Sequence, residues 1–280
     1  MSATPEFLTV PELAELLRIK ERKVYDLAST GEVPCTRATG KLLFPEADVR
    51  AWIEGKANGG RQARPAVFLG SHDPLLEWAL RQSRCGLATF FDSSDDGIDR
   101  FLKGEGIATG LHVHDPKSDE WNTTYVSESC STANAVLISW AARWRGLVMR
   151  KDSDIKSLDD VTGHRIATRQ PGSGTAVLWD RLVGMQPMSD VYLSEQDAVA
   201  AVAEGMADVT FGLRSMAEPL GLHFIPLLEE QFDLLVDRTA YFEPAFQDFM
   251  DFCRSNHFRQ RARAMRGHDV TFLGDVRWNS

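Results

Sequence analysis

Four short segments of this 280-residue chain place small polar residues at points where a strand is expected to give way to a helix. Backbone N–H groups at the start of a helix bind anions, serine hydroxyls add donors, and glycine lets a ligand approach closely. Each segment taken singly is more typical of ordinary helix capping, but four together predict a site for a small anion. The segments are Gly70-Ser71-His72-Asp73, Asp92-Ser93-Ser94, Gly172-Ser173-Gly174-Thr175 and Thr210-Phe211-Gly212-Leu213-Arg214.

Charged and aromatic side chains near these segments leave the class of ligand open. Arginine forks suit a carboxylate or a sulfonate. Tryptophan rings suit a cationic or apolar group, although core packing is their ordinary role. Asp95 and Asp96, beside the second segment, would repel a divalent oxyanion. The predicted ligand-binding residues are Ser71, His72, Ser93, Ser94, Trp121, Arg145, Arg169, Ser173, Gly174, Thr175 and Arg214.

Motifs of enzymes and metal sites are missing from the sequence. It has no phosphate-binding loop of the Walker type, no Gly-x-Ser-x-Gly elbow and no His-Glu-x-x-His pair. His72, His112 and His114 show no chelating spacing across their loops, and the four cysteines are far enough apart that we expect free thiols. We therefore predict no catalysis, no metal and no cofactor.

The segments that must position these loops alternate between strands and helices. Such alternation predicts an α/β domain with mostly parallel sheets, which bind ligands at the carboxyl ends of their strands. The expected strands are 66–69, 87–91, 107–111, 135–139, 146–149, 166–168 and 209–212, and the expected helices are 73–83, 95–103, 175–183 and 198–204.

The N-terminal segment predicts two short helices joined by the three residues 18–20. Thr9 is a candidate cap of the first helix, the second covers 21–29, a turn at 39–41 suggests a wing, and Pro45 opens a third helix. This geometry places a second helix in the major groove of DNA, although a protein-interaction module with a solvated charged face would show the same pattern. Candidate DNA contacts are Thr9, Arg22, Lys23, Tyr25, Arg37 and Lys41.

The charge of the chain is unevenly divided. The net charge is −9, yet residues 1–64 hold ten Lys and Arg against nine Asp and Glu, so nucleic-acid contact is expected there. A polar, glycine-rich linker at 55–65 separates a domain at 1–54 from one at 66–280. No apolar run approaches the roughly 20 residues that span a bilayer. The first residues lack the regions of a secretory signal, so we expect a cytoplasmic protein without membrane contact.

Several motifs of the N-terminal segment recur together in a known family. They are Leu8 to Leu17 (LTVPELAELL), Val24-Tyr25, Gly31-Glu32-Val33-Pro34, Phe44-Pro45, Val49, Ala51 and Trp52. Together they resemble the excisionase/MerR-type winged helix-turn-helix over residues 7–54. Lys20 departs from the pattern, because such modules usually have a polar capping residue before the second helix.

A second set of motifs lies between residues 66 and 268. They are Phe68 to Leu76 (FLGSHDPLL), Gly110-Leu111-His112 with Asp115, Trp121-Asn122, Arg169 to Thr175 (RQPGSGT), Phe224-Ile225-Pro226-Leu227 and Phe232-Asp233-Leu234. They resemble the periplasmic-binding-protein-like domain found behind a helix-turn-helix in bacterial regulators. The resemblance implies a type II fold of two α/β lobes that close over a ligand, with crossings near 149–151 and 225–229. The first lobe would then take about 66–149 and 228–280, and the second about 150–227.

The resemblance also implies a function. Such domains are commonly described as sensing molybdate or tungstate. Here Arg145 and Arg214 stand where uncharged or acidic residues are expected, so a small organic acid or zwitterion competes as the ligand. We expect a ligand-responsive transcription regulator, not a transport receptor or a plain adaptor. A homodimer or higher oligomer would bind two half-sites of operator DNA roughly 34 Å apart.

Overall fold

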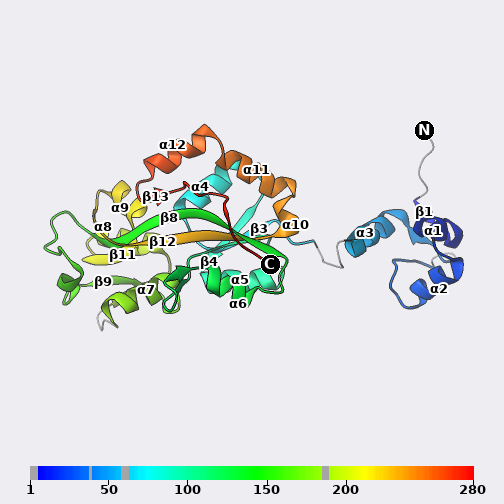
Figure 1. The fold of residues 1–280 in the computed structure, drawn as a ribbon, viewed down its shortest axis with the longest axis horizontal. Helices are drawn as coiled ribbons and strands as arrows, with labels where there is room; N and C mark the ends of the chain where they lie inside the picture. Colours follow the sequence, from blue (N-terminus) through cyan, green and yellow to red (C-terminus); the bar gives the residue numbers. More distant parts are fainter. Residues whose placement is uncertain (1–5, 38–39, 58–62, 185–188) are drawn as a thin grey trace. The chain divides into compact units, whose positions relative to one another are not determined.

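The computed structural model describes residues 6–37, 40–57, 63–184 and 189–280, which belong to two compact units, 1–63 and 64–280 (Figure 1). The predicted α/β fold class is confirmed: a helix-turn-helix precedes a mixed α/β unit of two lobes. Residues 58–62, the middle of the predicted linker, and Thr39 of the predicted wing lie outside the described residues. In the described ranges no helix is long and apolar enough to cross a membrane.

The first unit packs short helices around a small apolar core. Its elements are β1 (Phe7–Leu8), α1 (Val10–Leu17), α2 (Glu21–Ser29), β2 (Phe44–Pro45) and α3 (Glu46–Ala57). The core contains Leu8, Val10, Leu13, Ala14, Val24, Leu27, Val33, Phe44 and Val49. β1 and β2 pair in antiparallel fashion and so join the segment before α1 to the segment before α3.

Capping fixes the helix boundaries of this unit. The backbone N–H and the hydroxyl of Thr9 both donate to Glu12 Oε2 at 2.7 Å, a capping box for α1. After α2, Gly31 adopts φ +73° and the N–H of Glu32 donates to Leu27 O at 2.9 Å, which closes the helix end. The predicted three-residue turn and the 21–29 helix are confirmed. In the described part of the predicted wing, the strand pairing is limited to an antiparallel bridge between Thr36 and Leu43. α3 extends to Ala57 and so into the predicted linker.

The second unit is built on one mixed sheet. Its strands are β3 (Val67–Ser71), β4 (Ala88–Asp92), β5 (Ala108–Leu111), β8 (Ala135–Met149), β9 (Ile166–Arg169), β10 (Ser189–Tyr192), β11 (Val209–Leu213), β12 (His223–Asp237), β13 (His268–Asp269) and β14 (Val276–Asn279). The long antiparallel strands β8 and β12 run through both lobes. The order is β4–β3–β5–β12–β8–β14 in the first lobe and β12–β8–β11–β9–β10 in the second.

Helices cover both faces of the sheet in each lobe (Figure 1). In the first lobe, α4 (Pro74–Ser83), α11 (Pro244–Cys253) and α12 (Asn256–Ala264) pack on one face, and α5 (Ser94–Leu102) and α6 (Thr123–Ser129) on the other. In the second lobe, α7 (Gly174–Val183) packs opposite α8 (Glu195–Ala203) and α9 (Arg214–Ala217). The remaining short elements are β6 (His114–Asp115), β7 (Glu120–Trp121), η1 (Leu158–Val161), η2 (Glu218–Leu220) and α10 (Arg238–Tyr241).

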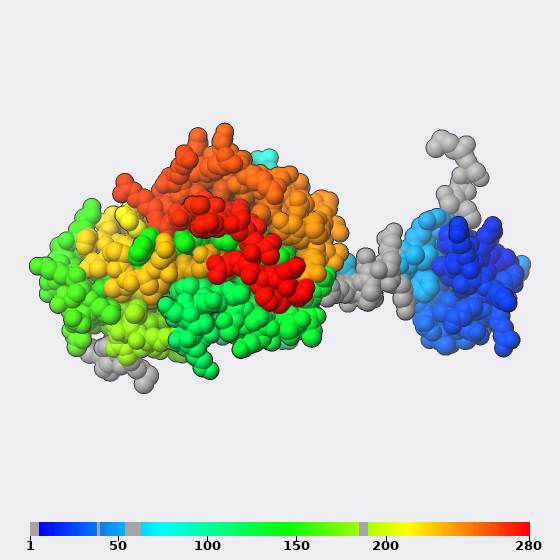
Figure 2. Space-filling model, viewed as in Figure 1, coloured from blue at the N-terminus to red at the C-terminus, as the bar shows by residue number. Residues whose placement is uncertain are grey.

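Three sequence expectations about this sheet are wrong. The strands predicted at 135–139 and 146–149 are one strand, β8, because Arg143 and Arg145 between them are fully buried. The first crossing therefore lies inside β8 and not at 149–151, since Arg145 already pairs with Leu213 of the second lobe. The second crossing lies in β12, whose register shifts between Pro226 and Leu228. The sheet is consequently mixed and not mostly parallel. Figure 2 shows the last residues, in red, on the surface of this unit.

Candidate functional site

Loops of both lobes line a cavity of about 250 Å³. It lies at the carboxyl ends of β3, β4, β5 and β9, as expected for a ligand site on parallel strands. Seven of the predicted ligand-binding residues line it: Ser71, His72, Ser93, Arg169, Ser173, Gly174 and Thr175. The remaining lining residues are Glu77, Phe91, Asp92, His112, Leu193, Ser194, Glu195 and Gln196.

Ser71 lines the cavity from the first lobe, and a second buried serine supports it from behind. Ser71 is the last residue of β3 and Ser94 is the first of α5, and their Oγ atoms lie 2.8 Å apart. Ser94 Oγ also accepts the N–H of His112 at 3.2 Å. The two elements can approach this closely only because residue 97 of α5 is glycine, since a Cβ there would lie 2.4 Å from Gly70 Cα of β3.

The start of α7 forms the second-lobe wall. Ser173 caps this ten-residue helix, and its Oγ accepts the N–H of Ala176 at 3.2 Å. Helical dipoles add up to a partial positive charge at such an end, which favours an anion. Gly174 lies directly against His112 of the other lobe, since a Cβ at Gly174 would come within 3.1 Å of His112 Cε1.

Arg169 supplies a positive charge at the end of β9. Its Nη1 donates to Tyr192 O at 3.1 Å, and it makes no ion pair with any carboxylate of the described ranges. Burial lowers the pKa of Arg169, and the negative charge of Glu195 opposes that effect. A half-buried guanidinium without an ionic partner is the kind of group that an anionic ligand can neutralise.

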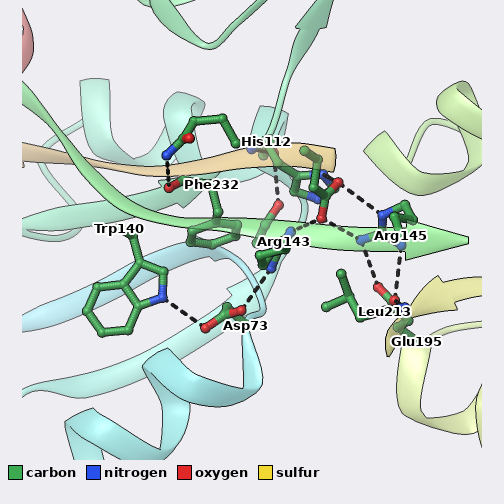
Figure 3. A network of polar contacts seen from close by, with 12 residues as sticks. Asp73, His112, Trp140, Arg143, Arg145, Glu195, Leu213 and Phe232 are labelled. Atoms are coloured by element: carbon green, nitrogen blue, oxygen red, sulfur yellow. Dashed lines mark hydrogen bonds and ion pairs between the residues drawn. The ribbon is translucent and has the colours of Figure 1, made fainter. Parts of the chain in front are cut away.

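A chain of buried ion pairs runs beneath the cavity from one lobe to the other (Figure 3). Arg143 bonds to Asp73 of the first lobe at 3.0 Å and to Glu230. The carboxylate of Glu230 accepts a hydrogen bond from Arg145 Nε at 3.0 Å. Arg145 Nη1 forms an ion pair with Glu195 of the second lobe at 3.0 Å. Glu195 also accepts the N–H of Leu213 at 2.8 Å.

The charges of this chain hold its acids ionised. Burial alone would raise the pKa of Asp73, but the charge and hydrogen bond of His268, with Arg143, hold that pKa well below its usual range. Burial likewise opposes ionisation of Glu230, but Arg143, Arg145 and His112 outweigh it and lower the pKa of Glu230. The chain reaches the cavity at two points, because His112, which bonds to Glu230, and Glu195 both line the wall.

Four predicted ligand-binding residues lie outside the cavity wall. Ser94 sits behind Ser71, and Arg145 is fully buried in the ion-pair chain. Trp121 packs against His114 and lines a separate cavity of about 580 Å³ near the strand crossings. Arg214 pairs with Glu218 at 2.8 Å and is not among the lining residues.

Residues that the sequence reasoning missed come mainly from two places. His112 belongs to the motif Gly110-Leu111-His112 but is not among the predicted ligand-binding residues, and its contact with Glu230 joins residues 118 positions apart. Ser194 caps α8, which starts three residues before the predicted 198, because its first turn is polar and carries no apolar periodicity. A serine followed by Glu195 and Asp197 is a recognisable capping signal that could have placed this helix start. In the described ranges no cluster of three or more His, Cys, Asp or Glu side chains could hold a metal.

The exposed face of α2 carries the candidate DNA-binding side chains. Arg22, Lys23 and Tyr25 are exposed, whereas Val24 and Leu27 face the core. Lys20 occupies the N-cap position without a side-chain capping bond. Beside the bridge of the wing, Arg37 and Lys41 are also exposed. The hydroxyl of Thr9 is engaged by Glu12.

Comparison with known proteins identifies the families to which the two units are similar. A model of the PBP superfamily domain matches residues 77–254, and a model of a helix-turn-helix domain matches residues 7–57. The chain is 25% identical over 306 residues to the uncharacterized protein YvgK of Bacillus subtilis, covering 96% of each chain. An uncharacterized protein from the 5′ region of a ferredoxin 2Fe-2S gene of Clostridium pasteurianum is 30% identical over 102 residues, which are 34% of this chain and 90% of that protein.

A solved structure supports the fold. The structure of a substrate-binding protein with bound phosphate from Clostridium perfringens matches with a TM-score of 0.53 at 12% identity. The match covers 75% of this chain and 99% of that one. At this level of identity the similarity concerns the arrangement of the two lobes only.

Proposed function

This chain belongs to the PBP superfamily and carries an N-terminal helix-turn-helix domain, and from this premise we propose that it is a cytoplasmic transcription regulator controlled by a small anionic effector. Residues 64–280, the effector unit, would bind the anion in the cavity between its lobes. Residues 1–63 would bind operator DNA through α2 in a homodimer or higher oligomer. Closure of the lobes would then change the placement of the DNA-binding units.

The observation that carries the ligand proposal is the pairing of Arg169 with the start of α7 in one cavity. Arg169 brings a half-buried charge without an ionic partner in the described ranges, and the start of α7 brings a positive helix end. Ser71 supplies a hydroxyl from the opposite lobe. An oxyanion such as molybdate or tungstate, or a small acid, would satisfy donors from both lobes at once.

A second candidate is a small organic acid or a zwitterion. Asp92 and Glu77 line the same cavity and would repel a compact dianion, whereas they could accept hydrogen bonds from a hydroxyl or ammonium group. The volume is about 250 Å³, whereas about 10–15 Å³ of such space is enough to hold one water molecule. That space exceeds the needs of a tetrahedral oxyanion and favours the larger ligand.

A thermal-shift screen tests the proposal. Molybdate, tungstate, sulfate, phosphate, small carboxylates and amino acids would each be added to the full chain. A ligand at 100 times its dissociation constant should add about 2.7 kcal/mol to the free energy of unfolding. If the oxyanions stabilise the protein and the organic compounds do not, the first candidate holds, and the reverse result supports the second.

The position of the anion is tested by Ser173→Asp, which places a negative charge at the start of α7. Affinity for the ligand found in the screen should fall at least about tenfold, since a lost charge-assisted hydrogen bond costs about 1.5–3 kcal/mol. Ser255→Asp is the matched control, because Ser255 caps α12 with the same geometry far from the cavity lining. Unchanged affinity in Ser173→Asp would rule out this anion site.

A further inference from the structure

His112 follows β5 and stands between the two lobes with one ring nitrogen already committed. Its side chain is 7% exposed and stacks on Phe232, with ring centroids 6.0 Å apart. His112 Nδ1 lies 3.1 Å from Glu230 Oε2. Because Glu230 is an ionised carboxylate, it can only accept, so Nδ1 must carry the proton of this bond.

The other nitrogen of this ring is available to a ligand. His112 Nε2 has no hydrogen-bond partner within the described ranges, and it is not among the atoms that are both buried and unpaired. His112 lines both the ligand cavity and a neighbouring one of about 180 Å³, and its Cε1 edge faces Gly174. The ring therefore presents Nε2 to the space beside the start of α7.

We propose that His112 binds the anionic group of the effector through Nε2 and takes up a proton from solvent when the effector arrives. The inference rests on the proposed function, because it concerns the same cavity. It adds a binding residue that is not among those predicted from the sequence, and it adds a dependence of affinity on pH.

The charges around the ring explain why the proton arrives with the ligand. Arg143 and Arg145 on β8, Arg169 on β9 and the positive end of α7 all oppose a further positive charge in the empty cavity. Glu230 on β12, Glu77 on α4 and Asp92 on β4 favour that charge. The carboxylate of Glu230 is already shared by both β8 arginines, and that of Glu77 is bonded to His72 and Arg81. Glu195 on α8 is likewise paired with Arg145. An anion between the ring and the start of α7 favours the protonated ring, and Nε2 then becomes an N–H donor.

Proton uptake has a definite sign in a binding experiment. The complex holds one proton more than the free protein, so affinity should fall as the pH rises through the neutral range, by at most about tenfold per pH unit. Sulfate is the probe, because its charge does not change in this range. Titration calorimetry in buffers of different ionisation enthalpy should give an uptake between zero and one proton per sulfate bound.

His112→Gln is the test variant, since glutamine keeps a neutral donor and cannot take up the proton. Sulfate affinity at pH 6 should fall about tenfold, and both the proton uptake and the pH dependence should vanish. His72→Gln should keep the proton uptake, because His72 Nε2 is bonded to Glu77 at 2.9 Å. His257→Gln, on the outer helix α12, should change neither affinity nor uptake.

Several results would overturn the assignment while leaving the anion site intact. They are sulfate binding without proton uptake, uptake that persists in His112→Gln, or uptake that vanishes in His72→Gln. Nitrogen NMR of the ligand-free protein tests the premise independently of any ligand. In the neutral ring of His112 the proton should sit on Nδ1, and a neutral ring with its proton on Nε2 would refute the proposal. Failure of every anion to bind would instead count against the proposed function.

Discussion

Glu230→Gln should destabilise the effector unit by several kcal/mol. Glu230 is fully buried and bonds to Arg143, to Arg145 and to His112. Glutamine fits the same space, but it removes the carboxylate that the buried guanidinium groups of Arg143 and Arg145 share. Removing one partner of a buried ion pair costs about 3–5 kcal/mol. For a domain of this size the midpoint of thermal unfolding should then fall by roughly 10 °C.

Denaturant unfolding followed by tryptophan fluorescence measures this loss. Asp208→Asn is the control, because Asp208 pairs with the half-exposed Arg165 at 2.8 Å and such a surface pair contributes about 0–1 kcal/mol. A loss below about 1 kcal/mol in Glu230→Gln, or an equal loss in the control, would refute the reasoning that the buried chain is a coupled set of charges.

The same variant should respond differently to acid. Asp73 and Glu230 have pKa values below those of the unfolded chain, so their stabilisation is present above the unfolded-state pKa of about 4 and is lost as the pH falls further. The Glu230→Gln variant lacks one of these two carboxylates and therefore lacks its share of the pH-dependent stabilisation. Its free energy of unfolding should therefore decline less steeply than that of the wild type below pH 4.

Three further predictions concern other parts of the molecule. The double variant Arg22→Ala, Lys23→Ala should lose operator binding in a gel-shift assay at unchanged effector affinity, and unchanged DNA affinity would refute α2 as the recognition helix. A fragment 63–280 should be more stable in denaturant than a fragment 66–280, because Arg64 pairs with Asp237 at 3.1 Å and lies over the ring of Phe101; equal midpoints would contradict this. Burial raises the pKa of Asp233 to about 6, so its contribution to stability is lost as the pH rises from about 4 to 6, and Asp233→Asn should flatten that part of the profile.

The sequence predicted best those elements that local chemistry determines. α2 was placed at 21–29 because Gly31 and the spacing of Val24 and Leu27 mark it, and no distant partner is needed. β8 was divided in two because Arg143 and Arg145 look like solvent-exposed residues in a linear pattern. Only partners on β12 and on the helices make them core residues. α11 and α12 were not predicted at all, although Pro244 and Ser255 stand at their starts.

The predictions for the candidate site were likewise correct where local sequence motifs supported them. Residues inside a local strand-to-helix motif, such as Ser71 and Ser173, line the cavity as the motif implied. Arg145 and Arg214 were predicted mainly from their charge, and the structure pairs Arg145 with Glu195 and Glu230 and pairs Arg214 with Glu218, so that neither arginine lines the cavity. A charged side chain in a sequence reveals its need for a partner but not which partner it finds. Arg169, which does line the cavity, belongs to the run from Arg169 to Thr175, whose last three residues line it too.

The position of the buried charges argues that they serve the cavity more than stability. Well-packed apolar residues in place of a buried ion pair are often neutral or stabilising, so stability alone does not account for two arginines at zero exposure. Their chain reaches the ligand cavity at two points, His112 from the first lobe and Glu195 from the second. An anion that touches both walls therefore acts on both lobes through one connected set of charges. Apolar substitutes would hold the lobes together equally well, but they would not respond to the charge of what the cavity contains.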